Sequence, residues 1–67
     1  MNEVTLEARY EARSEEITDA IEIYRHGKND YEVYYCNADC SVRGTLAEVM
    51  DELYSTFRPE DLVEVEA

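Results

Sequence analysis

The spacing of hydrophobic and polar residues predicts one helix very clearly, within residues 44–57. Thr45 and Glu48 form the Thr-x-x-Glu pattern of a capping box, which satisfies two backbone donors at a helix start. Pro59 ends the run because proline cannot continue helical hydrogen bonding. The apolar positions recur every three or four residues and share one helical side: Leu46, Val49, Met50, Leu53, Tyr54 and Phe57. The opposite side is acidic, so this amphipathic helix needs a sheet to cover its apolar side.

Segments in which apolar and polar residues alternate predict the strands of that sheet. Residues 3–13 alternate almost without error, which is typical of a half-buried strand. Two runs rich in Ile, Val and Tyr, residues 19–26 and 31–36, flank the turn sequence Gly-Lys-Asn-Asp and predict a β-hairpin. Residues 62–66 alternate again and predict a short edge strand.

Two connecting segments are less sharply defined. Residues 14–27 allow two interpretations, and residues 14–20 are open between strand, turn and helix. Ile17, Ala20, Ile21 and Tyr24 have helical spacing, with Ser14 as the cap and Gly27 just past the end, but the β-branched residues in 21–24 favour a strand. We prefer the strand, from about Asp19, because an evident second hairpin arm follows it. Residues 37–43 are expected to form a loop.

Together these elements predict a single α+β domain over residues 1–67. An antiparallel sheet of three or four strands carries one amphipathic helix on one face, in the order β-β-β-α with a final β. The helix is expected to cover Val4, Leu6, Tyr10, Ile21, Ile23, Val33 and Tyr35. The other sheet face is expected to stay open, with Glu3, Glu7, Arg9, Glu11, Glu22, Tyr24, Glu32 and Tyr34. Tyr24 and Tyr34 either pair across strands or serve an interface.

The charge of the chain narrows its possible partners. Seventeen acidic side chains face six basic ones, giving a net charge of −11, of which −6 falls from Gly44 onward. Phosphates would be repelled, so we expect no direct binding to nucleic acid or to a membrane. The charge favours a basic partner, although solubility or adaptation to high salt would also account for it.

Little in the sequence indicates catalysis or metal binding. Cys36, Cys40 and His26 offer three ligands, whereas a structural zinc ion takes four. The single histidine lies at a hairpin tip, and a chain of this size rarely encloses a large pocket. We therefore expect a non-enzyme without metal or cofactor. Two cysteines, no signal peptide and no membrane-spanning run favour the reducing cytoplasm.

The acidic residues themselves are the strongest functional signal. Carboxylates about 6.6 Å apart along a strand, or about 5–6 Å apart on a helix, approach the spacing of successive phosphates. We expect the partner-binding residues to be Glu48, Asp51, Glu52, Glu60, Asp61, Glu64 and Glu66, with Glu22, Tyr24, Glu32 and Tyr34 as a second candidate face. Charge reversal at Glu48 and Glu52 is expected to leave the fold intact.

The size, charge and sheet-plus-helix layout resemble small phage-encoded anti-CRISPR proteins that mimic DNA. The same seven acidic residues, from Glu48 to Glu66, carry this resemblance. It implies a monomeric inhibitor in the cytoplasm of the host cell. Its implied target is a basic Cas subunit through which a type I surveillance complex recognises DNA.

Residues 31–53 are similar to the core of the HicB antitoxin domain. A Tyr-x-Val-Tyr strand leads through a loop with Cys40 to Gly-Thr-Leu-Ala-Glu-Val, much as that family's strand leads to its capped helix. The usual loop of the family is replaced here by residues 37–43. This resemblance implies the alternative function of neutralising a small basic ribonuclease toxin.

Overall fold

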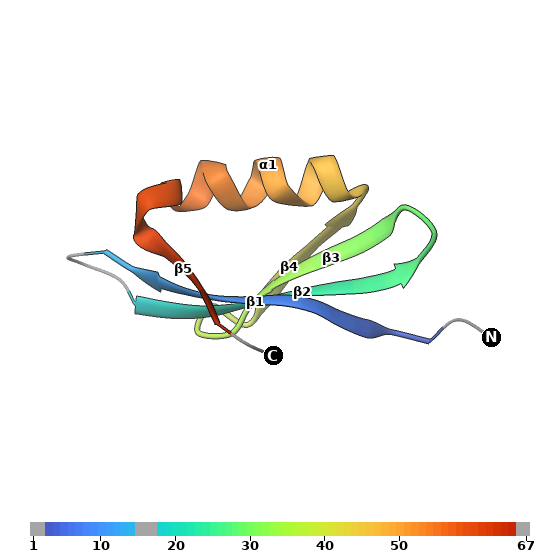
Figure 1. The fold of residues 1–67 in the computed structure, drawn as a ribbon, viewed down its shortest axis with the longest axis horizontal. Helices are drawn as coiled ribbons and strands as arrows, with labels where there is room; N and C mark the ends of the chain where they lie inside the picture. The colour runs from blue at the N-terminus through green and yellow to red at the C-terminus, as the bar shows by residue number, and fades with distance from the viewer. Residues whose placement is uncertain (1–2, 15–17, 66–67) are drawn as a thin grey trace.

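The computed structural model of this protein, which describes residues 3–14 and 18–65, contains a five-stranded antiparallel sheet with one helix across one face (Figure 1). The elements are β1 (Thr5–Arg13), β2 (Thr18–Gly27), β3 (Asp30–Tyr35), β4 (Cys40–Gly44), α1 (Leu46–Thr56), the 3₁₀ helix η1 (Pro59–Asp61) and β5 (Leu62–Val65). The strand order is β4-β3-β2-β1-β5. The predicted α+β class, with a helix on one sheet face, is confirmed.

The hairpin of β2 and β3 forms the centre of the sheet, as the alternating sequence predicted. Ile21 pairs with Tyr35 and Ile23 with Val33, so these four side chains share the face beneath α1. At the tip, Asn29 adopts a φ of 73°, a left-handed conformation that asparagine tolerates better than most residues. Since β2 begins at Thr18, the strand interpretation is confirmed there, while residues 15–17 lie outside the described residues.

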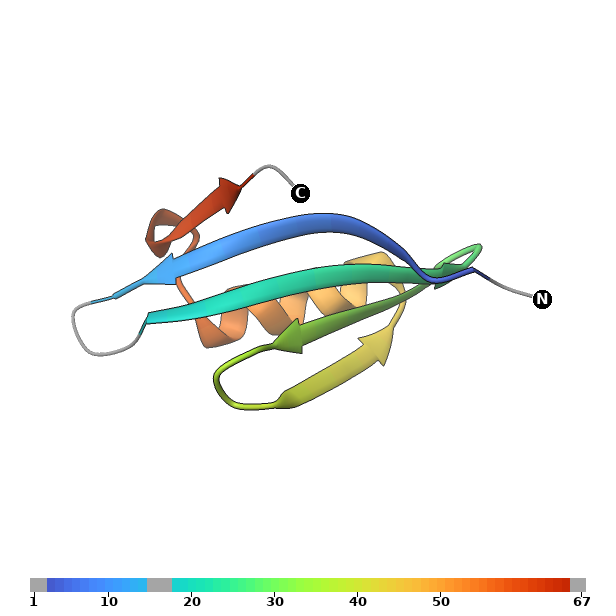
Figure 2. The same cartoon turned by 90° about the horizontal axis from the view of Figure 1, so that it is seen from below.

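The helix α1 begins with the predicted capping box and packs through a narrower stripe than expected. Val49 and Leu53 are fully buried, and Phe57, just after the helix, is 9% exposed. Leu46 and Tyr54, which the spacing placed on the same side, remain 43% and 48% exposed. A single helix crosses the sheet obliquely (Figure 2), so only the middle of its apolar side reaches the core.

The prediction of a loop at residues 37–43 was wrong for its second half. Residues 40–44 form β4, which pairs with β3 residue for residue, so the sheet has five strands instead of three or four. Asp39, at φ 52°, completes the turn between them. Apart from Gly44, every residue of β4 is exposed, and the strand contains little apolar alternation. It is held mainly by backbone pairing, which a hydrophobic pattern does not reveal.

A β-bulge in β1 overturns the predicted position of Leu6. The pairing with β2 shifts between Leu6 and Ala8, so Leu6 lies opposite Tyr24 on the open face. Ala8, Tyr10 and Ala12 then take the positions beneath the helix. Val4, also predicted for the core, lies before β1 and is 56% exposed. The bulge inserts one residue and so inverts the alternation on either side of it.

Candidate partner-binding surface

The residues predicted to bind a partner lie along α1, around its C-terminal end and onto β5 (Figure 1). We call this set the acidic surface: Glu48, Asp51, Glu52, Glu60, Asp61 and Glu64. Glu66 was predicted to belong to it but lies outside the described residues. The helix contributes three carboxylates over one turn, and residues 58–61, after Phe57, return the chain from the helix to β5.

Glu48 has a structural role that limits its freedom to meet a partner. Its carboxylate accepts the backbone N–H of Thr45 at 2.9 Å, and its own N–H donates to the Thr45 hydroxyl at 3.2 Å. The Thr45 backbone hydrogen bond lowers the pKa of the Glu48 carboxyl, so the charge is retained. Replacement of Glu48 by lysine would remove this acceptor and weaken the start of the helix. The expectation that charge reversal leaves the fold intact therefore applies to Glu52 and not to Glu48.

Asp51 and Glu52 leave the helix in different directions. Asp51 is exposed, and its carboxylate has no hydrogen bond or cation among the described residues. Glu52 is half-buried, and its charge contributes to the raised pKa of Tyr35, after the larger effect of burial. Asp51 is therefore the carboxylate of α1 that is most available to a partner.

The acids beyond the helix belong to η1 and β5. Glu60 is exposed and Asp61 half-buried, both within η1. Glu64 pairs with Tyr10 across the β1–β5 ladder, which places it on the same side of the sheet as α1. Burial, followed by the charge of Glu64, raises the pKa of Tyr10. The acidic surface thus continues from the helix to the sheet edge on one side of the molecule.

The acidic surface contains no ion pair. Four ion pairs occur in residues 3–14 and 18–65: Arg9–Glu22, Arg13–Glu11, His26–Glu32 and Arg43–Asp30. All of them lie on the strands. Arg58, the one basic residue after Gly44, forms no ion pair with another described residue.

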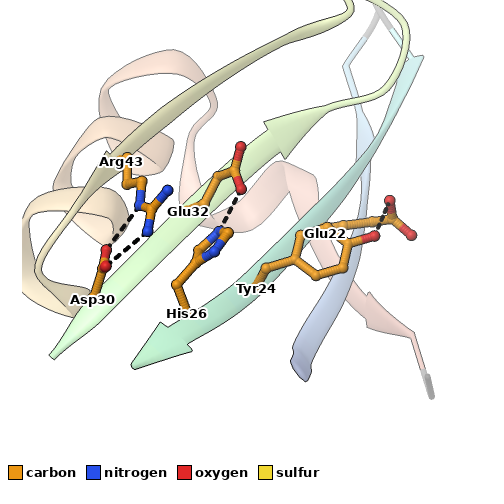
Figure 3. A network of polar contacts seen from close by, with 6 residues as sticks. All are labelled: Glu22, Tyr24, His26, Asp30, Glu32 and Arg43. Carbon is orange, nitrogen blue, oxygen red and sulfur yellow. Dashed lines mark hydrogen bonds and ion pairs between the residues drawn. The ribbon is translucent and has the colours of Figure 1, made fainter. Parts of the chain in front are cut away.

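The second candidate face is organised around Glu22, on the sheet surface opposite the helix (Figure 3). Its carboxylate accepts the Tyr24 hydroxyl at 2.9 Å, Arg9 Nη2 at 3.0 Å and the Cys36 thiol at 3.7 Å. The Tyr24 hydrogen bond, together with Arg9, lowers the pKa of Glu22. This carboxylate is therefore charged, it accepts hydrogen bonds from β1, from β2 and from Cys36 just after β3, and its side chain is 17% exposed.

A second cluster lies toward the hairpin tip of the same face. His26 Nε2 lies 2.6 Å from Glu32 Oε1 (Figure 3), in a bulge where the β2–β3 register shifts between Arg25 and Gly27. Hydrogen bonds from Ser41 and then from His26 lower the pKa of Glu32. Arg43 holds Asp30 through two hydrogen bonds of 3.0 and 2.8 Å. Each carboxylate here already has its partner within the protein.

Tyr24 and Tyr34 are not a cross-strand pair. Tyr24 lies opposite Glu32, and Tyr34 lies opposite Glu22, so the two tyrosines are diagonal neighbours. The Tyr34 hydroxyl donates to Asp39 at 2.7 Å, which raises the pKa of Tyr34 to about 12. Both hydroxyls are thus directed at carboxylates of this chain.

The cysteines and the histidine do not form a shared site. Cys40 pairs with Tyr35 on the helix side, whereas Cys36 contacts Glu22 on the open face. Both cysteines are free thiols, and burial raises the pKa of Cys36. No group of three His, Cys, Asp or Glu side chains suited to a metal ion occurs in the described part of the chain.

Some polar contacts were not anticipated from sequence. Asp19, 5% exposed, accepts the backbone N–H of Asn37 at 2.8 Å, and the Asn37 amide donates to the Thr18 carbonyl. These bonds fix the start of β2 to the β3–β4 turn. A turn-forming Asn-Ala-Asp sequence was visible, but its distant partner was not.

Searches of family models, curated proteins and solved structures found no match to this chain. Across the described residues, no helix has the length and apolar character needed to cross a membrane.

Proposed function

We propose that this protein is an inhibitor that occupies a basic nucleic-acid-binding site of a partner protein through its acidic surface. The carboxylates would take the positions of phosphates and thereby exclude the nucleic acid. The proposal rests on a difference between two sets of carboxylates: several on the strands are neutralised by basic side chains, and those of the acidic surface are not. The strand carboxylates of the described chain have basic partners at four places, and the acidic surface has none.

The cost of leaving these charges together supports a role for them. Glu48 lies three residues before Asp51 and four before Glu52, and like charges at these helical spacings destabilise a helix. Such repulsion falls when a basic surface approaches, and long-range attraction then accelerates association at low salt. Simple solubility does not require the charges to be concentrated on one side.

The partner class follows from the chemistry that would recognise this surface. Lysine and arginine side chains in a groove that holds a nucleic-acid backbone present the complementary charge. The resemblance to DNA-mimicking anti-CRISPR proteins narrows the proposal to a Cas subunit of a type I surveillance complex. A small basic ribonuclease toxin, implied by the similarity to HicB antitoxins, is the alternative partner.

The test is capture of partners from the source cells with the tagged protein, followed by competition. We expect a nucleic-acid-binding protein that is retained at about 50 mM salt, released at about 1 M salt and displaced by its own nucleic acid. A small toxin-sized partner that remains bound at high salt would favour the antitoxin alternative. A captured protein that nucleic acid does not displace would contradict phosphate mimicry.

Two variants with the same net charge separate a local surface from overall acidity. Asp51→Lys with Glu60→Lys alters exposed positions of the acidic surface and leaves the capping box intact. Glu3→Lys with Glu7→Lys makes the same change in charge at exposed positions near the start of β1. We expect the first variant to lose the partner and the second to keep it. Equal losses would show that total charge, not this surface, drives binding.

A further inference from the structure

The edge strand β4 has an exposed backbone ladder on its outer side. In the sheet order of the described chain, β4 lies at one end, next to β3 alone. The outward N–H and C=O groups of an edge strand form a template for another strand. Natural proteins normally protect such edges with charged side chains (lysine above all), proline, inward-pointing charge or a bulge.

The remaining edges of the sheet have more protection than β4, whose one charged residue, Arg43, is neutralised by Asp30. β5 spans four residues and carries the carboxylate of Glu64, whereas the part of β1 beyond the β5 ladder contains the bulge next to Glu7. β4 has the sequence Cys-Ser-Val-Arg-Gly, and its pairing with β3 runs without a register shift. It therefore presents a regular edge of five residues that lacks proline and lysine.

Charge makes β4 the least repulsive strand of the described sheet for a second copy of this chain. Two molecules of net charge −11 repel one another over most of their surfaces. Each of β1, β2, β3 and β5 contains at least one carboxylate, but β4 contains none and has one arginine. The carboxylate of Asp30 already holds that arginine, Arg43. β4 is thus the strand that itself sets no carboxylates against each other when two copies pair through it.

We propose that two copies of the protein pair antiparallel through β4, about a twofold axis at Val42. Val42 then faces Val42 of the second copy, Ser41 faces Arg43, and Cys40 faces Gly44. This register pairs all five residues of each strand. A shift of the axis to Arg43 would oppose two arginines, and a shift to Ser41 would leave part of β4 unpaired.

Exposed apolar side chains beside this edge support the assignment. Val42 is 37% exposed on β4, and Leu46, two residues after the strand, is 43% exposed. Pairing through β4 covers the side chain of Val42 and brings Leu46 toward the other copy. The twofold axis is perpendicular to the sheet, so both α1 helices lie on the same face of a ten-stranded sheet. This small interface predicts a dissociation constant of about 10 µM to about 1 mM.

The proposed dimer does not depend on the function proposed above. Salt should affect the dimer and the complex with a basic partner in opposite directions. Salt screens the repulsion between the two acidic copies and should strengthen the dimer, while it should weaken binding to a basic partner. Sedimentation equilibrium from about 10 µM to about 1 mM, in about 1 M salt, tests it directly. We expect the average mass to rise from 7.8 kDa toward twice that value.

Two single variants test the assigned edge. Val42→Lys should remain at the monomer mass throughout, while Val63→Lys, on the opposite edge, should behave as the unmodified chain does; circular dichroism checks that both are folded. An unmodified chain that stays at 7.8 kDa at the highest concentration would overturn the proposal. So would a Val63→Lys variant that dissociates equally.

Cross-linking provides a measurement that does not require loss of binding. In a background with Cys36→Ser and Cys40→Ser, Val42→Cys places one thiol on each side of the twofold axis. Directly opposed strand residues lie about 4.5–5.5 Å apart at Cα, within the range that a disulfide spans. Oxidised glutathione, as the two-electron oxidant, should yield a covalent dimer with Val42→Cys and much less with Val63→Cys. Equal yields would overturn the assigned edge.

Discussion

The carboxylates of the sheet and those of the acidic surface have the same chemistry but different surroundings. Glu22, Glu32 and Asp30 each accept hydrogen bonds from cationic or hydroxyl groups, and the pKa of each is lowered as a result. Asp51 and Glu60, on the helix side, are exposed and have no cation among the described residues. Glu22, Glu32 and Asp30 thus help to hold neighbouring strands together, whereas Asp51 and Glu60 remain open to solvent.

This difference shows that net charge alone is a poor guide to a binding surface. The second candidate face contains two carboxylates, Glu22 and Glu32, yet both already accept hydrogen bonds from side chains of this chain. A partner would have to break those bonds before making its own. Apart from Glu48, which caps the helix, the acidic surface offers charge without that cost, which is why we propose it as the binding surface.

The largest loss of stability is expected from a substitution that weakens the packing of α1 on the sheet. Leu53 is fully buried, so Leu53→Ala should lower the free energy of unfolding by about 2–5 kcal/mol, measured by urea denaturation. The neighbouring Tyr54 is 48% exposed, and Tyr54→Ala should cost less than about 1 kcal/mol. Similar losses for both would mean that the helix does not depend on this buried contact.

A smaller effect is expected from Glu22→Gln, which tests the sheet carboxylates. Loss of the charged acceptor for Arg9 and Tyr24 should cost about 1–2 kcal/mol at pH 7. The pKa of Glu22 is lowered on folding, so its stabilisation is complete above its ordinary value of 4.5 and is lost as the pH falls through the lower folded-state value.

The stability difference between the unmodified chain and Glu22→Gln should therefore shrink steadily in acid. Urea denaturation at pH 7 and at successively lower pH measures it. Glu7→Gln is the matched control, because Glu7 is an exposed glutamate of β1 with no ion pair among the described residues. A loss at Glu7 equal to that at Glu22 would contradict the special role of the Glu22 network.

The smallest predicted change has the opposite sign. Asp51→Asn removes a charge near Glu48 without a large change in helix propensity, so it should raise the free energy of unfolding by about 0.2–0.5 kcal/mol at low salt. The gain should disappear at about 1 M salt, where surface charges are screened. A gain that persists at high salt would show that charge repulsion is not its source.

Patterns within one element were predictable from the sequence, and contacts that depend on pairing were not. The capping box at Thr45 and Glu48 is local, and the hairpin around Asn29 depends on turn chemistry within a few residues. β4 depends on a neighbour, because its exposed residues 40–44 become a strand only when β3 offers its backbone. The displacement of Leu6 likewise follows from a bulge that appears only in the register with β2.

The candidate site shows the same division. The sequence predicted that acids gather on the outer side of α1, because helical spacing fixes which residues share a side. It did not reveal that Tyr24 and Tyr34 are occupied by carboxylates of this chain, since that depends on the β2–β3 register. Nor did it separate Glu48, which caps the helix, from Asp51, which is free of such a task.

The position of β5 has a consequence for how the protein is synthesised. Consecutive strands from β1 to β4 pair as neighbours, but β5 returns to β1, so Arg9 meets Val65 only after nearly the whole described chain has been made. During translation, the hairpins and α1 can assemble first. The backbone groups on the outer side of β1 then stay unpaired until β5 has been synthesised. Contacts distant in sequence form slowly, so this interval is when the nascent chain is most prone to aggregate.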